Sequence, residues 1–204
     1  MTNGGSMRRL RLIVPLLAIA LTGCGYNRIQ TLDEQINAFE GQIKVQLQRR
    51  ADLVPNLVET VRGYAQQEQT IFIGVAEARS RLNSAIQTGD LSQMATANQG
   101  LTGSLSRLIA VSENYPQLKS NDNFKALQDQ LEGTENRIAT ARQDYNSAVQ
   151  TYNSYIRQFP VVLTAKVIGK HSRAYFDLTT AGAAEVPHVN FTPPAAATPG
   201  ASKR

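Results

Sequence analysis

Apolar side chains recur at steps of three and four residues along most of this chain, and this period constrains the fold more than any other feature. Such spacing gathers them on one face of an α-helix, whereas a half-buried strand would alternate with period two. The pattern runs through four segments, over about residues 29–47, 57–86, 91–115 and 124–159. It predicts an all-α protein, an elongated antiparallel up-and-down four-helix bundle, with a short C-terminal helical extension over 161–168.

The ends of the first helix depend on local signals. Two pairs of residues have the spacing of a capping box at its start: Thr31 with Glu34, and Asn27 with Gln30. Pro55 has no backbone N–H and is tolerated in the first turn of a helix, where Asp52 would be the cap. We therefore predict a break before Pro55, the alternative being one long helix that kinks there.

Later breaks have clearer causes. Gly89 suits the left-handed position that ends a helix, and Asp90 can cap the next one. Tyr115 precedes a proline and so disfavours the helical conformation. One of residues 120–123 would then cap the fourth helix.

The N-terminal residues predict a membrane anchor. Arginines at 8, 9 and 11 precede a continuous apolar run over 12–21, and Cys24, the only cysteine of the chain, follows in Leu21-Thr22-Gly23-Cys24. A run of this length makes about 15 Å of helix, half of the roughly 30 Å of a bilayer core. The tetrapeptide resembles a bacterial lipobox. We expect residues 1–23 to be a lipoprotein signal peptide and Cys24 to carry the lipid, with palmitate among its acyl chains, the alternative being an uncleaved transmembrane helix.

The rest of the chain divides in two. Residues 24–180 are expected to form the bundle domain, in which Tyr175 and Phe176 pack back on the helices. Residues 181–204, rich in Pro, Ala and Thr, are expected to be disordered. The formal net charge is +5, but three of the arginines belong to the signal peptide, so the charge gives little support for a nucleic-acid partner.

Several long runs resemble the LemA family of bacterial membrane-anchored helical proteins. They are QRRADLVPNLVETVRGYA (48–65), VAEARS (75–80), ENYPQLKSNDNFKALQDQLEGTENRI (113–138), ARQDYNSAVQTYNSYIRQFP (141–160) and AYF (174–176). The resemblance implies a helical bundle behind an N-terminal membrane anchor, and it does not imply an enzyme. It also implies partners among membrane or envelope proteins, membrane-associated proteases among them.

Catalytic and metal-binding patterns are missing from the sequence. It has two histidines, of which His171 falls in an expected loop, and it contains no HExxH, CxxC, GxSxG or phosphate-binding loop. We expect no enzyme, no cofactor and no metal site.

Four polar features are candidates for partner contacts or for structural roles. Arg49, Arg50 and Asp52 could meet a partner or lipid headgroups, or could cap and pair at the expected helix junction. Glu68 falls on the apolar stripe and would need a partner such as Arg137 or Arg142, which would fix the helix register.

The other two features lie on the fourth helix. Glu135, Asn136 and Arg137 could join an interhelical polar network or could form a solvated face. Tyr145-Asn146 and Tyr152-Asn153 repeat seven residues apart, so Tyr145 and Tyr152 share one face. These tyrosines could pack in the core with outward hydroxyls, or they could form a docking surface.

These features predict a non-enzymatic, lipid-anchored scaffold or adaptor that acts by protein–protein binding at a cell-envelope membrane. It would face the periplasm or the exterior, and the outer membrane is favoured because Gly25 is not the aspartate that retains some bacterial lipoproteins at the inner membrane. The alternative is a self-associating, membrane-organising structural protein held by an uncleaved transmembrane helix.

Overall fold

The computed structural model describes the backbone of residues 4–176 and the side chains of residues 25–176. The elements are α1 (Gly4–Arg62), α2 (Gln69–Thr88), α3 (Leu91–Val111), the 3₁₀-helix η1 (Ser112–Asn114), α4 (Pro116–Lys119), α5 (Asp122–Tyr155) and α6 (Val161–Val167). The described residues contain no strand, and the prediction of an all-α helical bundle is confirmed.

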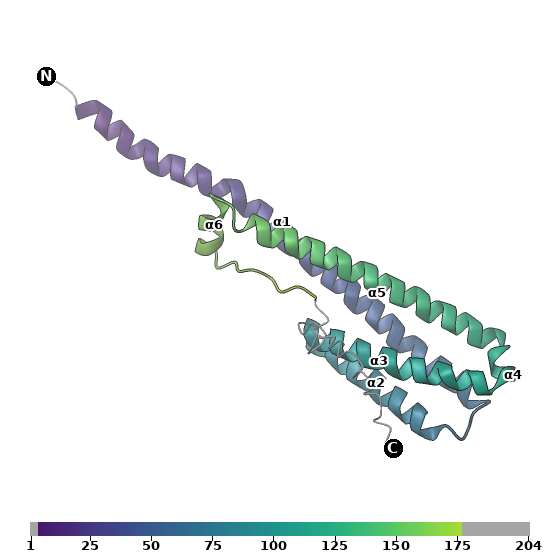
Figure 1. The fold of residues 1–204 in the computed structure, drawn as a ribbon. Coiled ribbons are helices and arrows are strands. Elements are labelled where there is room, and N and C mark those ends of the chain that lie inside the picture. The colour runs from purple at the N-terminus through teal and green to yellow at the C-terminus, as the bar shows by residue number, and fades with distance from the viewer. Residues whose placement is uncertain (1–3, 177–204) are drawn as a thin grey trace, which may run out of the picture.

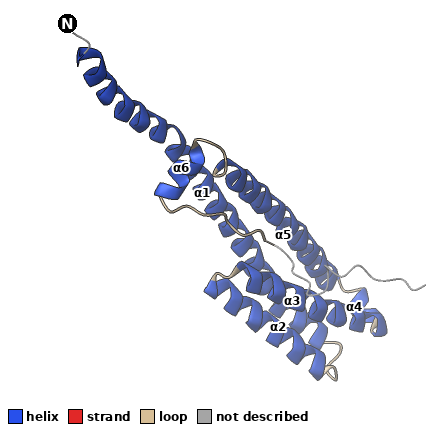
Figure 2. Ribbon diagram, turned by 60° about the vertical axis from the view of Figure 1, so that its left-hand side comes forward, coloured by secondary structure: helices blue, strands red, loops and turns tan. Residues whose placement is uncertain are grey.

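The bundle is built on one long antiparallel pair. Helix α5 runs back along α1, and the α2–α3 hairpin packs beside the part of α1 that lies farthest from the N-terminus (Figures 1 and 2). Helix α6 folds against α1 where the two long helices stop running together (Figure 2). The first part of α1 extends beyond this point, away from the rest of the molecule.

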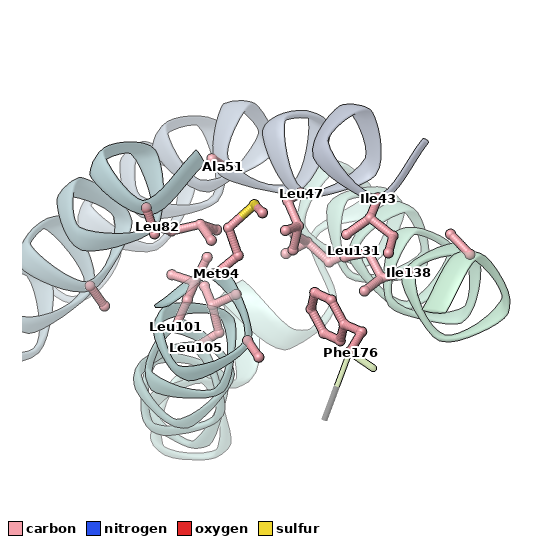
Figure 3. Packing of buried hydrophobic residues seen from close by; sticks show 14 of the residues in the cluster. Ile43, Leu47, Ala51, Leu82, Met94, Leu101, Leu105, Leu131, Ile138 and Phe176 are labelled. Carbon is pink, nitrogen blue, oxygen red and sulfur yellow. The ribbon is translucent and has the colours of Figure 1, made fainter. Parts of the chain in front are cut away.

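One continuous apolar core joins these helices. Its α1 residues keep the three- and four-residue steps of the sequence, with half-buried Phe39 bridging one longer gap: Ile29, Leu32, Ile36, Phe39, Ile43, Leu47, Ala51, Val54, Leu57 and Val61. Figure 3 shows Ile43 and Leu47 beside Leu131 and Ile138 of α5, and Met94 of α3 on the other side of Leu47. Full burial of a side chain of this size contributes about 1.5–3 kcal/mol, so the core is the main source of stability.

Two helix starts follow the sequence signals. Gly89 adopts a φ of 73° after α2, and the Asp90 carboxylate accepts hydrogen bonds from the backbone N–H groups of Ser92 (2.8 Å) and Gln93 (3.0 Å). Asn121 accepts a bond from the Phe124 N–H at 3.0 Å and so caps α5. These caps satisfy N–H groups that have no partner inside their own helix.

The predicted break at Pro55 is wrong, because α1 continues through it to Arg62. Proline removes the bond that the Ala51 carbonyl would accept from residue 55. The side chain of Arg79 on α2 replaces it and donates its Nε–H to that carbonyl at 2.8 Å. The carbonyl freed by Pro55 thus becomes a fixed contact between α1 and α2, and no new helix begins at Asp52.

The expected helix starts near Thr31 and Asn27 are also wrong. Both residues lie inside α1, and the Thr31 hydroxyl donates to the Asn27 carbonyl one turn back, at 2.9 Å. A threonine inside a helix commonly makes this bond. The actual break after α1 is a turn over residues 63–68, which begins at Gly63.

The C-terminal part of the described chain is partly as expected. Helix α6 lies within the predicted 161–168 segment. Phe176 is buried in the core, as predicted, whereas Tyr175 is 44% exposed. The expected tail over 181–204 and the domain end at 180 lie outside the described residues, as does the side chain of Cys24.

Candidate functional site

The chain after α6 crosses back over the bundle as an extended segment, residues 170–176, which we call the strap. Gly169 reverses the chain with a φ of 68°. Its N–H donates to the Lys166 carbonyl (3.3 Å), and the N–H of Lys170 donates to the Ala165 carbonyl (2.9 Å). This is a Schellman motif, which needs a left-handed residue at that position and so favours glycine. The motif ends α6 and directs the strap along α5.

Two asparagines of α5 bind the strap backbone through their amides. The Asn153 carbonyl oxygen accepts from the Arg173 N–H at 2.8 Å, and its NH₂ donates to the Arg173 carbonyl at 2.9 Å. Asn146 holds Phe176 in the same way, at 2.8 and 3.2 Å. Each amide therefore pairs with one strap residue as a neighbouring β-strand would.

The spacing of the two asparagines matches the spacing of their targets. Seven residues of helix span about 10.5 Å, and three residues of extended chain span about 10 Å. The seven-residue interval of the Tyr-Asn repeat therefore allows both asparagine amides to pair with one extended segment at the same time.

The tyrosines of the same repeat lie beneath the strap. Tyr145 and Tyr152 are 2% and 1% exposed, and the Tyr145 hydroxyl donates to the Ala174 carbonyl at 3.0 Å. Burial raises the pKa of both hydroxyls, and the carboxylates of Glu40 and Asp33 add to this effect on Tyr145 and Tyr152 respectively. The alternative of an open tyrosine docking surface is wrong, because this surface is occupied by the chain's own strap.

Asp33 ties the strap to α1. Its carboxylate accepts from the Lys170 ammonium at 2.6 Å and lies 3.1 Å from the Arg173 Nε, while its side chain is 15% exposed. The hydrogen bond to Asp33 raises the pKa of Lys170. Arg173 also donates to the Asn37 side-chain oxygen. We call Asp33, Asn146, Asn153, Lys170 and Arg173 together the strap joint.

A second polar cluster lies in the middle of the bundle. Arg50 of α1 is 4% exposed, donates to the Asn98 oxygen of α3 at 2.7 Å, and forms an ion pair with Glu135 of α5. Burial lowers the pKa of the Arg50 guanidinium, and the Glu135 carboxylate opposes this. The next residue, Ala51, accepts the bond from Arg79. We call these five residues the central joint, because one turn of α1 meets α2, α3 and α5 through them.

The other predicted positions are not part of either joint. Arg49, Asn136 and Arg137 are exposed. Asp52 is exposed and accepts from the Gln48 amide one turn before it.

The predicted role of Glu68 is wrong, because the turn over 63–68 interrupts the apolar stripe on which it was placed. Glu68 is half-buried at the start of α2, where its side chain makes no capping bond. Arg142 does not reach it and lies 5.0 Å over the Phe176 ring.

Sequence reasoning missed most of the joint residues. Asp33, Lys170, Arg173, Asn98 and Arg79 have no local pattern that marks them. Asn146 and Asn153 were marked by their seven-residue repeat, but the repeat was interpreted as evidence about the neighbouring tyrosines and not about the asparagines.

Among the described residues we looked for a metal site, a pocket and a membrane-spanning helix. These residues contain no cluster of three or more His, Cys, Asp or Glu side chains that could hold a metal ion. A groove of about 620 Å³ between α2 and α3 is lined mainly by small side chains, with Arg81 the charged residue of its lining. In the portion that the structure covers, no helix has the length and apolar character needed to cross a membrane.

Comparison with known proteins matches residues 39–191 to the model of the LemA family. Magnetosome proteins MamQ 1 and MamQ 2 of Paramagnetospirillum magneticum (strain ATCC 700264 / AMB-1) are each 32% identical over 180 residues. Magnetosome protein MamQ of Magnetospirillum gryphiswaldense is 29% identical over 180 residues. Each match covers 77% of this chain and 66% of the relative, just under two thirds of its length. Both joints include residues inside the family match, whereas Asp33 and the expected anchor precede it.

Proposed function

We propose that this chain, which belongs to the LemA family, is a non-enzymatic scaffold attached to a cell-envelope membrane by its N-terminal segment. The observation that carries the proposal is the continuity of α1. The apolar run over 12–21 and the core residues from Ile29 to Val61 lie on the same helix. A lipid on Cys24, three residues after that run on the same helix, or the uncleaved run itself would therefore hold the bundle through a continuous stretch of α1.

Both forms of the anchor put the same end of the bundle at the bilayer. A lipid on Cys24 would place its acyl chains one residue before Gly25, where the described side chains begin. An uncleaved transmembrane helix would bury the run that ends at Leu21, about 4.5 Å before Cys24 along the helix. We favour the lipid because the run is short for a span. The domain would then face the periplasm or the exterior, at the outer membrane.

The scaffold would act by being held at the membrane surface, close to its partners. Confinement to a membrane raises the effective concentration of the bundle for other membrane proteins, so even weak contacts with its helix faces would be populated. The relatives are named magnetosome proteins, and by analogy we propose that this chain contributes to a larger assembly. Envelope proteins, including membrane-associated proteases, are the proposed partners.

Proximity labelling in intact cells tests this function. A labelling enzyme fused to the chain should mark a reproducible set of envelope proteins, and the Cys24→Ala variant should lose that set. If both proteins mark the same neighbours, attachment through Cys24 does not select them. If the fusion marks only other copies of the chain, self-association is the better description.

A further inference from the structure

Three large apolar side chains are exposed on α6 and in the turn before it. Phe159, Leu163 and Val167 are 82%, 54% and 84% exposed. Leu163 and Val167 are four residues apart on one face of α6, and Phe159 lies in the turn just before this helix, which begins at Val161. The opposite face, with Thr164 and Ala165, is buried against α1. We call Phe159, Leu163 and Val167 the apolar tip.

The apolar tip lies at the end of the bundle from which the expected anchor emerges. Val161 packs on Gly25 so closely that a Cβ at Gly25 would lie 3.2 Å from its Cγ2. The expected lipid site, Cys24, directly precedes Gly25, and the apolar run over 12–21 of the alternative anchor ends about 6 Å before Gly25 along the helix axis. Figure 2 shows α6 beside α1 at this point, with the first part of α1 continuing beyond it.

The charges around the tip are mainly basic. Arg28, Arg157 and Lys166 are exposed and form no ion pair among the residues that the structure describes. The acidic side chains of the adjoining stretch of α1 are Asp33, which Lys170 and Arg173 already neutralise, and the exposed Glu34. Apolar side chains with a basic fringe are the composition that binds the surface of an anionic bilayer.

We propose that the apolar tip is a second membrane contact, in which Phe159, Leu163 and Val167 enter the interfacial layer of an anionic bilayer beside the N-terminal anchor. This inference rests on the anchoring proposed above. One attachment point lets a bundle tilt and rotate, whereas two fix which helix faces point along the membrane. Three side chains are too few for a stable protein interface, which needs about 800 Å² per partner, and the basic fringe would repel a second tip.

The absence of tryptophan from the chain allows a direct test. Phe159→Trp and Val167→Trp each introduce a single probe at an exposed position, and Ile73→Trp is the matched control because Ile73 is 57% exposed on α2. The full chain carrying each substitution is reconstituted into vesicles of phosphatidylcholine and phosphatidylglycerol with brominated acyl chains. Flotation shows whether the protein is on the vesicles, and circular dichroism shows whether it is folded.

We expect the emission of both tip variants to shift to the blue and to be quenched by the bromines, while the Ile73→Trp emission stays unquenched. Floating protein whose tip probes are unquenched would overturn this inference and leave the anchor intact. A blue shift that depends on protein density, without quenching, would also overturn it, because a second copy would then cover the tip. Failure to float would overturn the proposed function itself, and the tip contact with it.

Discussion

The central joint and the strap joint both tie α1 to distant parts of the chain, but they do so at different depths. The central joint buries a cation, Arg50, between three helices. The strap joint surrounds a partly buried anion, Asp33, with two more exposed cations, and its other bonds pair the amides of buried Asn153 and half-buried Asn146 with the strap backbone. The central joint should therefore affect the stability of the whole bundle, and the strap joint should affect the local stability of the strap.

The largest effect is expected from Glu135→Ala. It leaves the buried Arg50 charge with only Asn98 as a partner. Because the Glu135 side chain is itself 42% exposed, we expect the free energy of unfolding to fall by about 2–3 kcal/mol, less than for most fully buried pairs. Denaturant unfolding of the full chain in detergent, followed by circular dichroism, measures it. Glu132→Ala, at an exposed acid of the same helix, is the control and should change little. Replacing Arg50 and Glu135 together by methionine should recover most of the loss, and a double variant as unstable as Glu135→Ala would contradict the account.

Arg79→Met should cost about 1–2 kcal/mol, because the Ala51 carbonyl loses the donor that replaces its helical bond. Pro55→Ala in the same background supplies a backbone N–H at position 55 and should restore part of the stability. The same unfolding measurement on the four combinations gives the coupling. Additive effects of the two substitutions would mean that the bond from Arg79 does not compensate for Pro55.

Asn153→Ala should release the strap without unfolding the bundle. It removes two hydrogen bonds to Arg173, roughly 1–2 kcal/mol of local stability. Hydrogen exchange should show faster exchange at the Arg173 N–H, with α2 and α3 unchanged. Asn136→Ala, at an exposed asparagine of the same helix, is the matched control. Equal loss of protection in α2 and α3 would place the strap within the global folding unit.

Asp33→Asn should weaken the strap by about 1 kcal/mol, because a charge-assisted contact with two cations becomes neutral. The effect should shrink as salt is added, since Lys170 and Arg173 remain partly exposed and are screened. Exchange rates in the strap at low and high salt measure it. A salt effect of the same size at the central joint would remove the distinction between the two sites.

The smallest effect is expected at alkaline pH. The pKa values of Lys170, Tyr145 and Tyr152 are all raised in the folded chain, so the native state keeps protons that the unfolded chain releases above 10.0 for tyrosine and 10.5 for lysine. Stability should therefore be complete below these values and decline as the pH rises through them. Melting temperatures between about pH 9 and about pH 11 should fall more steeply for the wild type than for Tyr152→Phe. If the melting temperatures of the two proteins fell equally steeply with pH, the raised pKa of Tyr152 would not contribute to the pH dependence of stability.

The sequence predicted what depends on neighbouring residues and missed what depends on distant ones. Asp90 and Asn121 cap helices through N–H groups two or three residues away, so their roles were readable locally. Pro55 was misinterpreted because the donor that replaces its missing bond is Arg79, which lies 28 residues after the accepting Ala51.

The strap shows the same limit. The Tyr-Asn repeat indicated a shared helix face, and the burial of Tyr145 and Tyr152 followed from ordinary core packing. The asparagine contacts require a glycine turn and an extended segment 20 to 30 residues later in the chain. No periodicity in the helix could identify that segment as the occupant.

Attachment through the N-terminal segment is the claim on which the proposed function depends. Alkaline carbonate extraction of cell membranes tests it directly, by comparing the full chain with a variant that lacks residues 1–26. The account predicts that the full chain stays with the membranes and that the shortened chain is released. Release of the full chain, or retention of both, would contradict it.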